Sequence, residues 1–71
     1  MKVVLELHKE LYFLPLIRRA MDDYSKLAHI TVKDAGEYFV CTFSRCKYDA
    51  VTTQHEFANY LIDLSNSKES L

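Results

Sequence analysis

Glycine and proline are almost absent from this chain of 71 residues, which contains one of each, Gly36 and Pro15. So few chain breakers predict short loops between well-defined helices and strands. A single glycine also argues against a backbone cradle for phosphate, and the sequence has neither a Gly-rich phosphate loop nor a metalloprotease motif. A chain of this length buries only about 60% of the surface that it exposes when unfolded. We therefore expect one domain with a small core.

Charge of one sign and long apolar runs are lacking as well. The formal net charge is −1, and the lysines and arginines form no stripe, so we expect no nucleic-acid partner and no membrane partner. No apolar run approaches the roughly 20 residues of a membrane-spanning helix. The start, MKVVLELHKE, alternates and lacks the continuous apolar segment of a signal peptide. These features predict a cytoplasmic protein.

The residues that are present follow two clear periodicities. The chain is 49% hydrophobic and 27% charged, as in ordinary globular proteins. Residues 2–8 alternate, with Val3, Leu5 and Leu7 on one face, which predicts a half-buried strand. Helical spacing follows, and we place a helix at 14–26, with Pro15 in its first turn. Its apolar stripe is predicted to contain Phe13, Ile17, Ala20, Tyr24 and Leu27, flanked by Leu16 and Met21.

The second half of the chain repeats these patterns in the order hairpin, then helix. Residues 28–32 and 38–43 alternate on either side of DAGE, where Gly36 can adopt a positive φ in the turn. Residues 47–65 return to helical spacing, with Phe57, Leu61 and Leu64 as the apolar stripe. Thr53 followed by Glu56 fits a capping box at the start of this helix.

The element order is therefore β-α-β-β-α, which predicts an α+β fold. We expect a three-stranded antiparallel sheet in the order 2-3-1 with both helices on one face, as in a ferredoxin-like fold without its last strand. The first strand would then be an exposed edge. An arrangement with the first two strands adjacent and parallel stays open. We place a single domain at 1–65 and a frayed tail at 66–71.

The two cysteines are the first candidates for chemistry. Cys41 alternates with Phe39 and Phe43, so we expect it in the core, where a free thiol packs as a small hydrophobe. Cys46 follows the strand beside Arg45, and we expect a surface thiol there. A structural zinc site needs four ligands in tight pairs, a requirement that these thiols and His55 do not meet. We predict no metal, no cofactor and no disulfide.

The histidines and acids carry little further signal. His8 and His29 have the same outward parity, so the two side chains could approach each other on the outer sheet face. No serine or aspartate is placed to form a catalytic group with them, and we predict no enzyme. The pairs Arg18–Asp22 and Arg19–Asp23 are expected to stabilise the exposed face of the first helix.

The outer sheet face is the predicted binding surface. Its ordinary explanation is a half-solvated antiparallel sheet, but tyrosine is enriched at binding hot spots, and an open strand edge can accept an added strand. We therefore predict a protein or peptide partner, or a second copy of the chain. The candidate partner-binding residues are Val4, Glu6, His29, Tyr38 and Val40.

The layout also resembles a known family. The carrying segments are LIRRAMDDYSKLAHITV, the hairpin KDAGEYFVCTF and the closing HEFANYLIDL, preceded by Tyr12. In FANYLID, Phe57, Asn59, Leu61 and Asp63 match a Phe-x-Asn-x-Leu-Leu-Asp-like pattern. Over residues 3–64 the chain resembles the small accessory protein of the His-Xaa-Ser peptide-maturation system, HxsD. The resemblance implies a non-catalytic partner of radical-SAM maturases that act on a repeat-containing precursor peptide.

Three functional hypotheses follow. The first is a small interaction or accessory module that assists peptide maturation. The second is a homodimeric structural or regulatory protein that pairs through its exposed strand edge. The third is a small thiol-dependent enzyme that uses Cys46 and His55.

Overall fold

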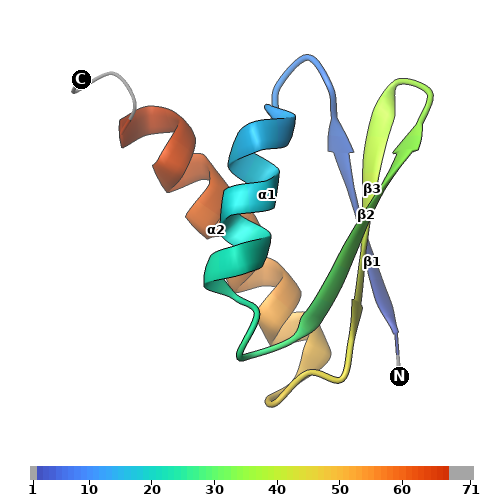
Figure 1. Ribbon diagram of the computed structural model, residues 1–71, viewed down its shortest axis with the longest axis vertical. Coiled ribbons are helices and arrows are strands. Elements are labelled where there is room, and N and C mark those ends of the chain that lie inside the picture. Colours follow the sequence, from blue (N-terminus) through green and yellow to red (C-terminus); the bar gives the residue numbers. More distant parts are fainter. Residues whose placement is uncertain (1, 68–71) are drawn as a thin grey trace.

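The computed structural model describes residues 2–67 and contains the five expected elements. They are β1 (Val3–His8), α1 (Leu14–Asp23), β2 (His29–Ala35), β3 (Tyr38–Ser44) and α2 (Ala50–Ser67). The sheet is antiparallel throughout in the order β1-β3-β2, so the predicted α+β class and strand order are confirmed. The alternative with adjacent parallel β1 and β2 is wrong. Both helices lie on one side of the sheet (Figure 1).

The inward-facing residues of the strands meet both helices in one core. The buried members are Leu7, Ile17, Ala20, Ala28, Ile30, Cys41, Phe43, Phe57 and Leu61. The Phe43 ring from β3 and the Phe57 ring from α2 pack edge to face, with 5.1 Å between their centroids. This edge-to-face geometry adds to the stabilisation from area burial, because the positive ring edge meets the negative ring face.

Helix α1 ends three residues earlier than the predicted range 14–26. At its end the hydrogen-bond spacing shortens from four residues to three. The Tyr24 N–H donates to the Ala20 carbonyl at 2.9 Å, and the Ser25 N–H donates to the Asp22 carbonyl at 3.2 Å. The chain then turns through 24–27 to enter β2. Phe13, predicted in the apolar stripe, precedes the helix as its N-cap residue and is 64% exposed. The stripe starts one turn later, with buried Ile17 and Ala20.

The hairpin between β2 and β3 closes through two residues, Gly36 and Glu37, because Ala35 pairs directly with Tyr38. Gly36 has φ +74, a conformation that costs an L-residue about 1–2 kcal/mol. The positive φ predicted for this glycine is confirmed. The chain leaves β3 through Arg45, which also has a positive φ of 51.

Helix α2 begins at Ala50, so the predicted capping box is wrong. Asp49 caps the helix instead: its carboxylate accepts the Thr52 N–H at 2.9 Å and the Thr52 hydroxyl at 3.0 Å. Thr53 is buried in the first turn and donates its hydroxyl to the Asp49 carbonyl at 2.8 Å. At its other end α2 extends to Ser67, two residues past the expected domain boundary, and 68–71 of the predicted tail lie outside the described residues.

The charged face of α1 is organised differently from the expectation. The pairs Arg18–Asp22 and Arg19–Asp23 are not among the ion pairs of residues 2–67, where Lys9 pairs with Asp34. Asp23 accepts a hydrogen bond from the Tyr60 hydroxyl of α2. Asp23 therefore helps to fasten the two helices together.

Candidate protein-interaction surface

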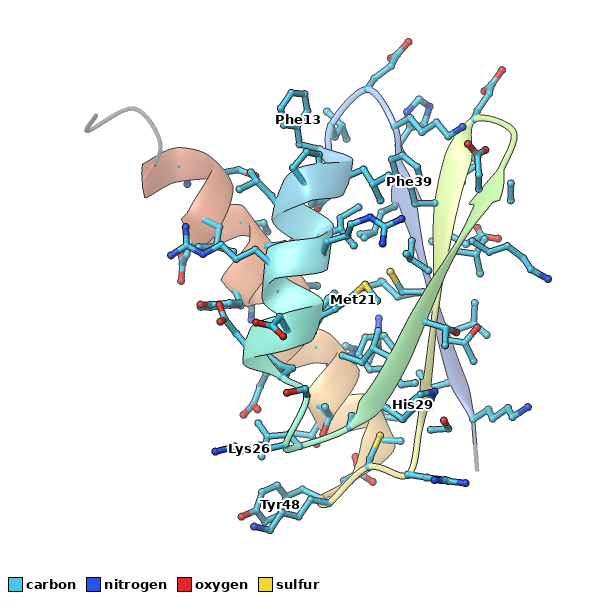
Figure 2. The ribbon with its side chains drawn as sticks, in the orientation of Figure 1. Phe13, Met21, Lys26, His29, Phe39 and Tyr48 are labelled. Atoms are coloured by element: carbon cyan, nitrogen blue, oxygen red, sulfur yellow. The ribbon has the colours of Figure 1, made fainter. Side chains whose placement is uncertain are left out.

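The outer sheet face is the side of the sheet opposite the helices. Strand register arranges it in rows that run across β1, β3 and β2. The rows, read in that strand order, are Val4–Thr42–Thr31, Glu6–Val40–Lys33 and His8–Tyr38–Ala35. Figure 2 shows side chains projecting from this side of the sheet, with no further layer of secondary structure beyond them.

Val40 lies at the centre of this face, between an acid and a base. It sits on the central strand β3, with Glu6 on one side and Lys33 on the other. Val4 is 55% exposed on the edge strand β1. The face therefore offers two apolar contacts beside charges of both signs, a composition that suits a polar-rimmed protein contact.

Tyr38 also lies on β3, but at the hairpin end and not at the centre of the face. Its ring packs edge to face against His8, with centroids 5.0 Å apart, and the residue is 39% exposed. The His8 Nδ1 atom accepts the backbone N–H of Glu10 at 3.2 Å, which orients the imidazole. Tyr38 is therefore an aromatic side chain held by a neighbour and still open to a partner.

The two histidines on this face do not approach each other. His8 is paired with Tyr38 at one end of β3, and His29 is paired with Ser44 at the other end. Six residues of a strand span about 20 Å. The expectation that His8 and His29 could meet is wrong. Because β1 and β2 both run antiparallel to β3, they run in the same direction, so His8 at the end of β1 and His29 at the start of β2 lie at opposite ends of the sheet. Among the predicted binding residues, His29 is therefore separated from Tyr38.

The thiols are placed partly as expected. Cys41 is fully buried, and desolvation raises the pKa of its thiol to about 11. Cys46 is half-buried against the core, so the expected surface thiol is only partly accessible. Both cysteines are free. Within residues 2–67, no cluster of three or more His, Cys, Asp or Glu side chains is arranged to hold a metal ion.

Strand β1 forms one free edge of the sheet, as expected from the predicted order. The Lys9 N–H donates to the Glu37 carbonyl at 3.0 Å, in the same register as the β1–β3 ladder. In an antiparallel ladder, backbone groups alternate between the two sides of a strand. Odd-numbered β1 residues therefore bond to β3, and the backbone groups of Val4 and Glu6 point away from the sheet, at the free edge.

Sequence reasoning missed an apolar turn between β1 and α1. Leu11 is 73% exposed there, close to Phe13. These side chains line a shallow hollow together with Leu16 and Ser65. The signal was the run LYFLPL at 11–16: its first three residues precede the helix predicted at 14–26, and they are unusually apolar for a connecting turn.

Comparison with known proteins adds no relative. The chain matches no protein-family model, no curated protein and no solved structure. None of the helices within the described residues is long and apolar enough to span a membrane.

Proposed function

We propose that this chain is a small, non-catalytic cytoplasmic module that binds a protein or peptide through its outer sheet face. The observation that carries the proposal is that no other element of residues 2–67 covers this face, so the apolar side chain of Val4 and the ring of Tyr38 are left substantially exposed on it. Tyrosine binds partners well, because its ring contributes a large contact area at a small entropic cost and its hydroxyl forms hydrogen bonds.

The resemblance to the His-Xaa-Ser accessory family suggests the partner class. On this proposal the chain assists a radical-SAM maturase or its precursor peptide, and any radical chemistry and its cofactor belong to that partner. Three segments of the chain carry the resemblance, and each of them contributes buried residues to the core, while the hairpin also supplies part of the outer sheet face.

The test of this proposal is a substitution on the outer sheet face with a matched control elsewhere. Tyr38→Asp places a charge at the proposed contact, and we expect it to weaken capture of a radical-SAM maturase or its precursor peptide by the tagged chain at least tenfold, as at a typical hot spot. Tyr48→Asp makes the same chemical change at a tyrosine that is 65% exposed in the turn before α2. Capture should survive this control.

Mass spectrometry of the captured proteins gives the readout, and circular dichroism checks that both variants stay folded. If Tyr38→Asp and Tyr48→Asp capture the partner equally well, the outer sheet face is not the binding surface.

The free edge of β1 favours a second candidate function, a homodimeric structural or regulatory protein. Edge strands present unpaired backbone donors and acceptors, which a second chain can satisfy by strand addition. Sedimentation of the purified chain tests this candidate, since a strict monomer at high concentration contradicts it.

A further inference from the structure

We propose that the occupant of the β1 edge is a second copy of this chain. The two β1 strands pair antiparallel around a two-fold axis that passes between Leu5 of one copy and Leu5 of the other, a register called here the axis at Leu5. The proposal rests on the second candidate function and specifies its interface. It does not require the outer sheet face to bind a partner. The product is one continuous antiparallel sheet of six strands, three from each copy, with the four helices on one side.

The first support is the direction of the backbone groups on β1. The N–H and carbonyl groups of Val4 and Glu6 point to the free edge, whereas the His8 carbonyl already accepts the N–H groups of Leu11 and Tyr12, at 3.0 and 3.1 Å. The segment with both groups available therefore centres on Leu5. An antiparallel neighbour that places Glu6 opposite Val4 satisfies all of these groups.

The second support is the symmetry of the pairing. A two-fold axis perpendicular to the sheet keeps the helices of both copies on one side, so inward residues must pair with inward residues. With the axis at Leu5, Val3 lies opposite Leu7 of the second copy, and Val4 lies opposite Glu6. Every residue from Val3 to Leu7 then lies opposite a β1 residue of the second copy.

Neighbouring registers are less favourable. With the axis at Glu6, the two Glu6 carboxylates stand directly opposite each other, and like charges in that position are destabilising. With the axis at Val4, only residues 3–5 of β1 lie opposite β1 residues of the second copy, because the strand begins at Val3. With the axis at Leu7, the bonded pair includes His8, whose carbonyl is already occupied.

The third support is the surface beside the β1 edge. Helix α2 packs on β1 and β3, and it turns Tyr60 toward Tyr24, the residue that directly follows α1. The flank away from α1 therefore lies on the β1 side. By helical spacing this flank presents Val51, Gln54 and Ala58, none of which is charged, and Val51 is 48% exposed. Two such flanks can approach without like-charge repulsion.

The other sheet edge lacks these properties. Strand β2 carries Lys33 and Asp34, and the hollow between β2 and α1 is lined by Arg18, Asp22 and His29. Exposed edge charges of this kind oppose pairing with another sheet. Strand β1 carries a single charged residue, Glu6, against these two on β2, so the charge distribution favours β1 over β2 for self-association.

The register is tested by charge at one exposed position. In the proposed pairing, residue 4 lies opposite Glu6 of the second copy at two symmetric places. Val4→Glu creates two repulsive pairs and should raise the dimer dissociation constant about tenfold or more, whereas Val4→Lys creates two attractive pairs and should leave it unchanged or lower it. Sedimentation of the untagged full chain gives the constants, and circular dichroism verifies folding.

Each outcome decides the proposal. A wild-type dimer that Val4→Glu weakens and Val4→Lys preserves supports it. If both substitutions weaken the dimer equally, or neither changes it, the register around Leu5 is wrong although a dimer exists. If the wild-type chain stays monomeric up to millimolar concentration, the dimer itself is excluded. Neither of these failures alters the Tyr38→Asp test of the outer sheet face.

Discussion

At the scale of single residues, the two thiols differ because of their surroundings and not because of the sequence around them. Cys41 has no exposed surface and lies between Phe39 and Phe43 on β3. Burial penalises the thiolate, which raises the pKa of Cys41 to about 11. Cys46 sits in the loop after β3 and keeps part of its surface exposed. Position in the fold thus separates two chemically identical groups.

This contrast predicts the order of alkylation. The thiolate is the reactive form of cysteine, so iodoacetamide at mildly alkaline pH should modify Cys46 in the folded chain at least tenfold faster than Cys41. Cys41 should become reactive only when denaturant unfolds the protein. Peptide mass spectrometry over a time course measures both rates. Equal rates in the native protein would contradict the burial of Cys41.

At the scale of elements, the start of α2 shows how a nearby competitor displaces a sequence motif. Thr53 with Glu56 has the spacing of a capping box, yet Asp49 lies one turn earlier and binds the Thr52 N–H and hydroxyl. Capping at Asp49 extends the helix by a turn and places Thr53 inside it, where the Thr53 hydroxyl is satisfied by the Asp49 carbonyl. A longer helix makes more backbone hydrogen bonds, so the earlier cap is favoured.

The cap makes a prediction about stability. Asp49→Ala should lower the midpoint of thermal unfolding, because the N–H groups of the first turn lose their acceptor. Asp49→Asn keeps an acceptor oxygen and is the matched control, which should retain most of the stability. Thermal unfolding followed by circular dichroism measures both variants. An Asp49→Ala midpoint equal to that of the wild type would show that Asp49 is not the cap.

The same cap depends on pH with a defined sign. Hydrogen bonds from Thr52 lower the pKa of Asp49 in the folded chain. The contribution of this carboxylate to stability is therefore present at pH values above its unfolded pKa, and it is lost as the pH falls through the folded value. The stability difference between wild type and Asp49→Asn should accordingly shrink in acid.

At the scale of the whole molecule, a small core makes each large side chain important. Phe57 is fully buried and contacts the rings of both Phe43 and Tyr24, so it joins α2 to the sheet and to α1. A chain of this size has a total stability of about 4–10 kcal/mol, and truncation of a buried Phe to Ala costs about 3–5 kcal/mol. One residue therefore carries a large share of the stability.

We expect Phe57→Ala to be partly or fully unfolded at room temperature. Ile17→Val removes only one methyl group from a fully buried side chain and should cost about 0.5–1.5 kcal/mol, so it serves as the control that remains folded. Urea unfolding monitored by circular dichroism compares the two. A Phe57→Ala variant with a cooperative transition close to that of Ile17→Val would contradict the central place of Phe57.

The buried faces of the strands and helices could be predicted from the sequence, because apolar residues alternate along the strands and recur at helical spacing along the helices. Val3, Leu5 and Leu7 occupy one face of β1 in the structure as the alternation predicts, and Phe57 and Leu61 occupy the buried face of α2. These periodicities are local, because they follow from backbone geometry that repeats every two or every 3.6 residues. The turn at Gly36 is local for the same reason.

The candidate surface could be predicted from the sequence only in part. Outward parity identified Val4, Glu6, Tyr38 and Val40, but it did not reveal that His29 lies at the far end of the face or that Leu11 is exposed in a turn. Parity assigns a residue to a face, while the position of the residue within that face depends on register between strands that are distant in sequence.

The sequence by itself therefore determined the elements, their order and the inward side of each, since these depend on neighbouring residues. The tertiary structure decided between the two strand orders that the sequence left open, and it also decided where α1 stopped and which residue capped α2. Those features depend on contacts between segments far apart along the chain. The open β1 edge was expected from one of these two orders, but the uncharged flank of α2 beside it is a feature that only the folded chain shows.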